Sequence, residues 1–300
     1  SSILRAGATV VFADIDKQTQ NIDPNSIISK ITKNTKAILC VHLGGMPCDM
    51  YLIQKITKKY NLKLIEDCSQ AHGAKYFNKY VGSFGDISVW SFCNDKIIST
   101  LGEGGMIGTK TYNNFKKIWS IKEIGKDFLL SNTKEKTSFK WVHNNLGTNM
   151  RMTEVQAGVG RLQLKALAKN IKKRRILANL FFKRLSKSKL FQPPIKKIGY
   201  NNSYYKFYLF LNPNVLKKKF IRSKIISFLK KQNIQVSVGS CPEIYREKIF
   251  NKIRTFEKLP NANYVGKVSI AFSINQFQKL SYINKICNNL KYIEKTINIK

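Results

Sequence analysis

Acidic residues are scarce in this sequence. Only 17 Asp and Glu stand against 53 Lys and Arg in 300 residues, which gives a formal net charge of +36. Such a charge is typical of proteins that bind nucleic acid or an anionic membrane surface. The lysines, however, are scattered along the whole chain, and the densest runs, 169–175 and 217–224, accompany no zinc-finger, RNP or helix-turn-helix signature. We therefore predict that the charge is a compositional bias and that nucleic acid is not a partner.

Long hydrophobic runs are also absent. No stretch reaches the roughly 18 apolar residues that span a bilayer, and the first residues lack the basic-then-apolar pattern of a secretory signal. We expect no membrane association and a cytoplasmic location. The six cysteines form no CxxC pair and show no metal-ligand spacing, so we predict reduced, mostly buried thiols and no metal site: Cys40, Cys48, Cys68, Cys93, Cys241 and Cys287.

The chain also has no initiator Met, and an apparent strand, 8–15, begins almost at once. This start predicts a fragment of a longer protein. With 43% hydrophobic residues, the chain is nevertheless long enough for a substantial core and about two domains.

Short apolar segments rich in β-branched residues alternate with amphipathic stretches from residue 7 to about 109. This pattern predicts an α/β fold with a largely parallel sheet and flanking helices. Asp23, Asp49 and Thr153 each stand where an N-cap would open a helix, and Thr153 forms a capping box with Gln156. The expected strands are 8–15, 36–43, 62–68, 87–92 and 104–109.

The pair Pro193-Pro194 ends a long stretch without proline that begins after Pro47. The remainder of the chain has the pattern of a smaller α+β unit, with strands expected at 204–212 and 234–239 and an amphipathic helix at the end. We predict a large domain over 1–186, which includes a long connecting helix, and a small C-terminal domain over 187–300.

Polar side chains follow two of the predicted strands, where ligands of open α/β sheets bind. Asp67 and Gln70 follow the strand 62–68, and Ser91 and Lys96 follow the strand 87–92. Asp67 alone is as well explained as the cap of a turn, and one lysine among so many carries little information. The neighbours of Lys96 make it a stronger candidate than other lysines, because Ser91 precedes it and a glycine-rich turn, 102–105, follows it. Hydroxyl and exposed backbone N–H groups of this kind form a modest phosphate site.

Three ordered segments, EDCSQAHGA (66–74), GSFGDISVWSFCNDKIISTLGEGG (82–105) and LGTNMRMTEVQAGVGRLQL (146–164), carry a family resemblance. Together they resemble the DegT/DnrJ/EryC1/StrS sugar aminotransferases, which belong to fold type I of the pyridoxal-phosphate (PLP) enzymes. The resemblance covers nearly the whole chain. It implies a large domain that starts upstream of Ser1, where further phosphate-binding and ring-stacking residues would lie.

The resemblance also implies a role for each motif residue. Lys96 would form a Schiff base with PLP and shuttle a proton, and Asp67 would keep the pyridine nitrogen protonated. Gln70 would lie near the cofactor ring, and Ser91 would bind its phosphate. Asn149 would reach the phosphate in the neighbouring subunit, which implies a homodimer.

The implied reaction is transfer of an amino group, from glutamate, to a nucleotide-linked keto sugar in amino-sugar and surface-polysaccharide biosynthesis. Two alternatives remain: a PLP-dependent sugar dehydratase of the same family, in which His typically replaces the lysine, and a non-catalytic basic binding protein. The chain departs from the family at 121–125, where many members have Arg and His-Gly, and at Ile274-Asn275, which replaces a common His-Pro. These departures concern substrate contacts. Tyr204, Tyr205, Lys206 and Tyr208 are suggestive substrate-side residues, although core positions suit the aromatics better.

Overall fold

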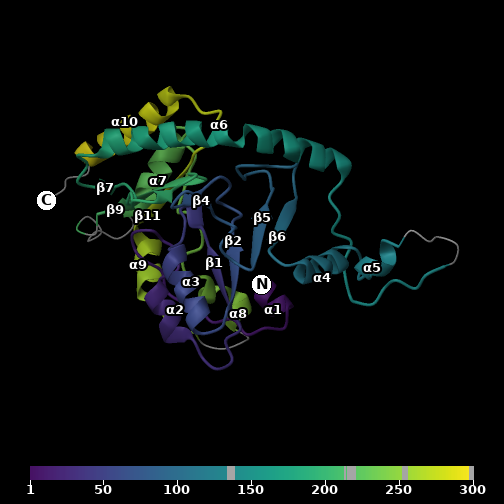
Figure 1. The fold of residues 1–300 in the computed structure, drawn as a ribbon. Helices are drawn as coiled ribbons and strands as arrows, with labels where there is room; N and C mark the ends of the chain where they lie inside the picture. The colour runs from purple at the N-terminus through teal and green to yellow at the C-terminus, as the bar shows by residue number, and fades with distance from the viewer. Residues whose placement is uncertain (134–138, 213, 215–220, 252–255, 297–300) are drawn as a thin grey trace.

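A computed structural model describes residues 1–133, 139–212, 214, 221–251 and 256–296. Its first sheet has the strand order β1-β2-β5-β6 (Figure 1). β1, β2 and β5 are parallel, whereas β6 runs antiparallel to β5 and closes one side of the sheet. The predicted α/β fold with a largely parallel sheet is therefore confirmed. The strands are β1 (Ala37–Val41), β2 (Lys63–Asp67), β5 (Ile87–Ser91) and β6 (Gly105–Thr109).

The predicted helix starts are confirmed by their capping hydrogen bonds. Asp23 accepts from the Asn25 N–H at the start of α2 (Pro24–Lys30), and Asp49 accepts from the Leu52 N–H at the start of α3 (Met50–Lys59). Thr153 and Gln156 form a complete capping box at the start of α6 (Glu154–Leu185). Local sequence therefore fixes where these three helices begin, because each cap satisfies an N–H group that the helix itself leaves unpaired.

The strand predicted at 8–15 is wrong. Residues 8–14 are not assigned to a strand, and Ile15 forms an isolated bridge with Ile22. The Asp14 N–H of this segment donates to a side chain, the Ser26 hydroxyl, at 2.7 Å. The carboxylate of Asp14 in turn caps the start of α9 (Pro260–Val268), where it accepts from the Ala262 N–H at 2.9 Å. A β-rich composition is not enough when no neighbouring strand accepts the ladder bonds.

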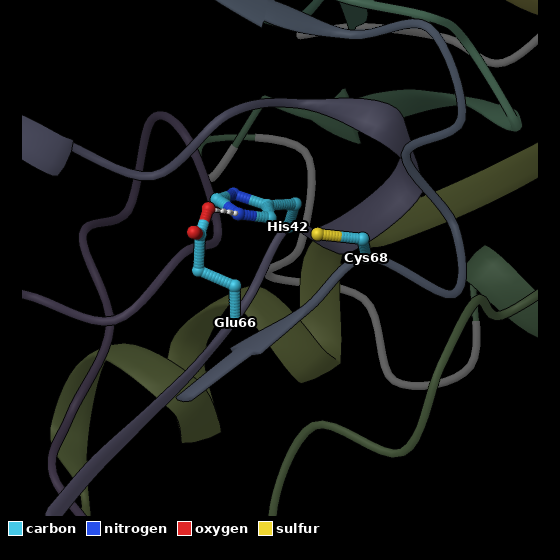
Figure 2. Close-up of side chains that lie close together, drawn as sticks. All are labelled: His42, Glu66 and Cys68. Atoms are coloured by element: carbon cyan, nitrogen blue, oxygen red, sulfur yellow. Dashed lines mark hydrogen bonds and ion pairs between the residues drawn. The ribbon is translucent and has the colours of Figure 1, made fainter. Parts of the chain in front are cut away.

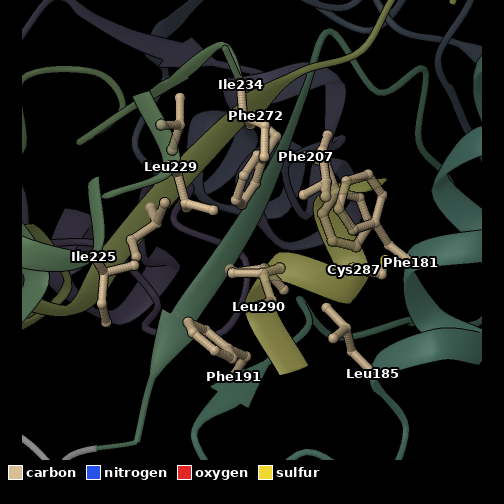
Figure 3. Close-up of a cluster of buried hydrophobic side chains, with 14 of the residues drawn as sticks. Phe181, Leu185, Phe191, Phe207, Ile225, Leu229, Ile234, Phe272, Cys287 and Leu290 are labelled. Carbon is tan, nitrogen blue, oxygen red and sulfur yellow. The ribbon is translucent and has the colours of Figure 1, made fainter. Parts of the chain in front are cut away.

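The second sheet is antiparallel, with the order β10-β11-β9-β7. The last turns of α6 cover it, and α10 packs beside α6 (Figure 1). Leu177, Phe181 and Leu185 recur every four residues on α6 and join a core with Phe207 and Phe272 (Figure 3). The strands are β7 (Phe191–Gln192), β9 (Lys206–Leu211), β10 (Val236–Ser237) and β11 (Ser269–Ser273), and the covering helices are α7 (Ile221–Lys231) and α10 (Leu280–Thr296).

Short elements connect these two sheets. The hairpin β3 (Lys75–Tyr76) and β4 (Lys79–Tyr80) pairs with β8 (Tyr200–Asn201) in a third small sheet. α6 ends at Leu185, and the division of the chain into 1–186 and 187–300 stays a prediction. The other elements are α1 (Ser2–Arg5), η1 (Leu43–Gly45), α4 (Tyr112–Lys122), α5 (Phe128–Ser131), η3 (Ile244–Arg246) and α8 (Lys248–Asn251).

Among the described residues, no helix is both long and apolar enough to cross a membrane. All six cysteines are free thiols, and four of them are buried, as predicted: Cys40, Cys48, Cys68 and Cys287.

Candidate functional site

The carboxyl ends of β1, β2 and β5 meet at one edge of the first sheet. Asp67 is the last residue of β2 and lies in register with Val41 of β1 and Val89 of β5. Ser91 is the last residue of β5 and pairs with Gly105 of β6. Both side chains are half-buried. The structure therefore places two predicted site residues, a carboxylate and a hydroxyl, at the same edge of adjacent strands.

Gln70 joins this edge through a loop contact. Its side-chain oxygen accepts a hydrogen bond from the Gly44 N–H at 2.8 Å. Gly44 lies in η1, directly after β1, and adopts a φ of 63°, a conformation that favours glycine. A side chain from the loop after β2 thus fixes the loop after β1, which shapes the edge where Asp67 lies.

Lys96 lies in the loop after β5, and its amine contacts two other polar groups. Nζ lies 3.0 Å from Oδ1 of Asp95 and 3.4 Å from the phenol oxygen of Tyr205. Tyr205 donates a hydrogen bond to the other carboxylate oxygen of Asp95. Burial opposes ionisation of Asp95, but the hydrogen bonds from Tyr205 and Lys96 outweigh it and lower the pKa of this carboxyl. The Lys96 side chain is 16% exposed, so the amine is shielded but reachable.

The sequence named Tyr205 only as a suggestive substrate-side residue, and its contacts with Asp95 and Lys96 were missed. The aromatic run 204–208 suits a buried strand, and Tyr205 is indeed 5% exposed. Its ring packs in a small cluster with Ile97 and Ile171, yet its hydroxyl points to Asp95. Only the second sheet, which brings Tyr205 across 109 residues to Lys96, reveals the contact.

His72 packs against residues at the end of β5, just before the loop that carries Lys96. Its ring is 2% exposed and lies 5.3 Å from the Trp90 ring and 5.8 Å from the Phe92 ring, measured between centroids. Burial lowers the pKa of His72 to about 4, helped by the positive charges of Lys96 and Arg174. The imidazole is therefore neutral at physiological pH.

His42, Glu66 and Cys68 form a buried cluster beneath the same edge, with atoms spaced as metal ligands would be (Figure 2). The ligand atoms of His42 and Glu66 already take part in hydrogen bonds. His42 Nδ1 accepts from the Cys48 N–H at 3.0 Å, so Nε2 carries the proton and donates to Glu66 at 3.1 Å. Burial raises the pKa of the Cys68 thiol. Glu66 also accepts from the backbone N–H groups of Gly82, Phe84 and Gly85 at 2.6–2.7 Å.

These bonds give the cluster a structural explanation. Its hydrogen bonds hold the loops that follow β1 and precede β5 against β2, and a metal would have to displace them. The absence of a metal site stays a prediction.

Asn149 lies apart from the other predicted site residues. It is exposed and forms an isolated bridge with Glu123, at the end of α4. Its segment docks on α4 through backbone bonds and through the ion pair between Arg151 and Glu123, whose atoms are 2.7 Å apart. Lys122 and Arg151 together lower the pKa of Glu123. The structure thus places Asp67, Gln70 and Ser91 at one sheet edge and Lys96 in the loop that follows Ser91, whereas Asn149 lies beside Glu123 at the end of α4.

The densest basic run, 169–175, lies on α6, and two of its cations turn inward. Arg174 is 3% exposed and donates to the backbone oxygens of Tyr204 and Ile274. Arg175 donates to the Asn202 oxygen at 3.0 Å. Burial lowers the pKa of Arg174 to about 10, which leaves it charged at neutral pH. These cations join α6 to the start of β9. Of the second basic run, residues 217–220 lie outside the described residues.

The fold agrees with comparisons to known proteins. A model described as the DegT/DnrJ/EryC1/StrS aminotransferase family matches residues 1–291. The chain belongs to this family. It is 32% identical to dTDP-3-amino-3,6-dideoxy-alpha-D-galactopyranose transaminase of Aneurinibacillus thermoaerophilus over 280 residues, 93% of this chain and 71% of that protein. It is 39% identical to GDP-perosamine synthase of Escherichia coli O157:H7 over 186 residues, 62% of this chain. The match spans about half, 48%, of that synthase.

Solved structures of an aminotransferase and of a dehydratase share the fold. An aminotransferase from Psychrobacter cryohalolentis matches with a TM-score of 0.93 and 36% identity, over 99% of this chain and 78% of that one. The E. coli GDP-4-keto-6-deoxy-D-mannose-3-dehydratase, solved with hydrated PLP, matches with a TM-score of 0.85 and 25% identity, over 96% of this chain and 75% of that one. The predicted family and its fold type I architecture are confirmed.

Proposed function

We propose that the protein transfers an amino group, from glutamate, to a nucleotide-linked keto sugar in amino-sugar and surface-polysaccharide biosynthesis, with PLP as cofactor. One observation carries the proposal. Lys96 lies in the loop after β5, and Asp67, Gln70 and Ser91 lie at the edge of the first sheet where β2 and β5 end. Relatives named for nucleotide-linked sugars support the substrate class.

The chemistry of these side chains fits the cofactor. When bound, PLP supplies an aldehyde that condenses with amines and a pyridine ring that takes up electrons. In the described part of the chain, Asp67 accepts one hydrogen bond, from Ser69 N–H to Oδ1, which leaves Oδ2 for a cation. At an effective dielectric of about 20, a carboxylate about 4 Å from a cation contributes on the order of 4 kcal/mol. Asp67 therefore suits a protonated ring nitrogen.

Two further groups would hold the cofactor in place. Ser91 offers a hydroxyl that, within the described residues, accepts a long bond of 3.4 Å from the Cys93 N–H. With the glycine-rich turn 102–105 it would bind phosphate. Gln70 would lie near the ring, where its bond to Gly44 keeps the side chain fixed. Lys96 would hold the cofactor and move a proton at Nζ.

A homodimer belongs to this proposal. The first half of α6 exposes Val155 (67%), Leu162 (67%) and Leu164 (61%), and Met150 beside Asn149 is 62% exposed. The second half of the same helix is buried in the core under the second sheet. Val155 and Leu162 lie about two turns apart on one side of α6, its apolar face, whereas Leu164 lies on the opposite side. Exposed apolar side chains on a charged chain mark an association surface. Asn149, in the segment before α6, would then reach the partner's site.

The cofactor site is tested by absorbance. Full-length protein mixed with PLP is expected to show a visible band of bound cofactor that disappears in Lys96→Ala. Lys117→Ala, which removes an exposed lysine of α4, serves as the matched control and is expected to keep the band. A band of wild-type strength in Lys96→Ala would rule out Lys96 as the cofactor residue.

A PLP-dependent sugar dehydratase is the second candidate, because one of the structural neighbours has that activity. The family resemblance places His at the lysine position in such enzymes, whereas this chain has Lys96. Incubation with a nucleotide keto sugar distinguishes the two. An aminotransferase consumes the sugar only when an amino donor is present, and a dehydratase consumes it without one.

A further inference from the structure

The segment 143–151, which carries Asn149, is not held by burial in a core. All of its residues are exposed. Backbone hydrogen bonds tie it to the end of α4 instead, such as the bond of 2.8 Å from the Thr148 N–H to the Ile121 oxygen. Exposed backbone bonds open readily, so by themselves they hold a segment only loosely.

Glu123 adds a charged contact to these backbone bonds. It directly follows the last residue of α4 and is 9% exposed. One of its carboxylate oxygens contacts the Lys122 amine, and the other accepts a hydrogen bond from Arg151 Nη1 at 2.7 Å. Arg151 is the second residue after Asn149, so the Cα atoms of these two residues lie within about 8 Å of each other. A bond that fixes Arg151 therefore limits where Asn149 can lie.

The position of Glu123 is unfavourable for α4 itself. The C-terminal end of a helix carries a partial negative charge, which repels an anion. The carboxylate is matched instead by the two cations beside it, Lys122 and Arg151. Without the carboxylate, these cations would be two like charges at the end of α4, and their repulsion would favour displacement of the segment 143–151.

We propose that Glu123 is a positioning residue for the active site of the partner subunit. Through Arg151 it holds the exposed segment against α4, and Asn149 thereby projects toward the cofactor phosphate of the partner subunit. The inference rests on the proposed homodimer and on the proposed role of Asn149. Met150 and Val155, on either side of Arg151, are 62% and 67% exposed. A partner that covers them would also shield the ion pair from water and strengthen it.

The first experiment compares two ligands that differ only in the phosphate. Full-length protein is titrated with PLP or with pyridoxal, and borohydride reduction followed by peptide mass spectrometry measures the ligand trapped on Lys96. Glu123→Gln should weaken PLP binding about fivefold, the size expected for a partly exposed ion pair, and leave pyridoxal binding unchanged. Lys122→Ala is the matched control. It removes the other cation from the carboxylate but keeps the pair with Arg151, so PLP binding should be that of wild-type protein.

A double variant tests whether Glu123 acts through Asn149. Asn149→Ala should also weaken PLP binding. Addition of Glu123→Gln to it should cause no further loss, because the side chain that Glu123 positions is then absent.

Mixed dimers show in which subunit Glu123 acts, and a different affinity tag on each subunit allows their purification. In the first mixed dimer, one subunit carries Lys96→Ala and the other carries Glu123→Gln. The intact Lys96 then meets Asn149 from the subunit with an intact Glu123, and PLP should bind as in wild-type protein. In the second mixed dimer, one subunit carries both substitutions and the other is wild type. The intact Lys96 then meets the displaced Asn149, and PLP should bind about fivefold more weakly.

The inference is overturned by wild-type PLP affinity in Glu123→Gln, by an equal loss of pyridoxal binding, by a further loss in the double variant, or by weak binding in the first mixed dimer. A Glu123→Gln protein that is monomeric in light scattering also overturns it, because the residue would then act on assembly. None of these results affects the proposed cofactor role of Lys96. Absence of trapped PLP on wild-type Lys96 would instead overturn the proposed function, and a monomeric wild-type protein would overturn the proposed homodimer, each together with this inference.

Discussion

The imidazole of His42 donates a hydrogen bond to the carboxylate of Glu66, and both side chains are fully buried. Burial opposes the negative charge of Glu66, but His42 and the backbone N–H groups of Gly85 and Gly82 outweigh it and lower its pKa. The carboxylate therefore stays ionised inside the protein. It links the ends of two strands to the loop before a third, directly beneath the candidate cofactor site.

Glu66→Gln should destabilise the fold by about 3 kcal/mol at pH 7, because one amide oxygen cannot accept all the bonds of a buried carboxylate. Since the folded pKa is depressed, Glu66 stabilises the fold above the unfolded value near 4.3, and this contribution is lost as pH falls through the folded pKa. Urea unfolding of both proteins at pH 7 and pH 3 measures the difference, which should shrink at pH 3.

Glu257→Gln is the matched control for this change. Glu257 is 80% exposed and, among the described residues, forms an ion pair with Lys30, so its loss should change stability little. A cost in Glu257→Gln equal to that in Glu66→Gln would contradict the structural role of Glu66. Zinc that stabilises wild-type protein but not Glu66→Gln would show that the cluster is a metal site.

His72 should make the protein sensitive to mild acid. Its folded pKa, about 4, lies below the usual value near 6.5, so only the unfolded chain takes up the proton between these pH values. Stability should therefore fall as pH drops from 6.5 to 4, by about 3 kcal/mol for this group, and level off below 4. His72→Phe removes the titration. Its unfolding free energy should depend less on pH in this window, and an unchanged slope would refute the prediction.

Gly125→Ala should detach the segment that carries Asn149. Gly125 has a φ of +83°, and an added Cβ would lie 1.7 Å from the Asn145 carbonyl oxygen. We expect a loss of about 2 kcal/mol and faster hydrogen exchange at the amides of Thr148 and Met150. Gly158→Ala is the control, because Gly158 lies within α6 with no atom of the described chain near the added Cβ. Protected exchange at Thr148 in Gly125→Ala would contradict the expectation.

The proposed homodimer predicts that a charge introduced at one exposed aliphatic position disrupts the dimer and that a charge at another does not. Leu162→Arg places a charge on the apolar face of α6 and should shift the protein toward monomer in light scattering. Ile198→Arg, at a position that is 92% exposed and outside α6, should not. A monomeric wild-type protein, or equal effects of the two substitutions, would refute the predicted surface.

Local chemistry in the sequence determined much of this protein. The caps at Asp23, Asp49 and Thr153 act within a few residues, so they could be identified without tertiary structure. Asp67 and Ser91 follow apolar strands directly, and parallel pairing brings strand ends to one edge. The motifs around Lys96 carried enough information to predict the family and the fold.

Tertiary structure alone decided the rest. The segment 8–15 has strand composition but forms no strand, and Asp14 bonds to α2 and to the start of α9. Tyr205 has the pattern of a core residue, and its hydroxyl reaches Asp95 only because the second sheet packs against the loop after β5. Hydrophobic pattern specifies which face of an element is buried, but contacts over a hundred residues apart depend on how the two sheets pack together.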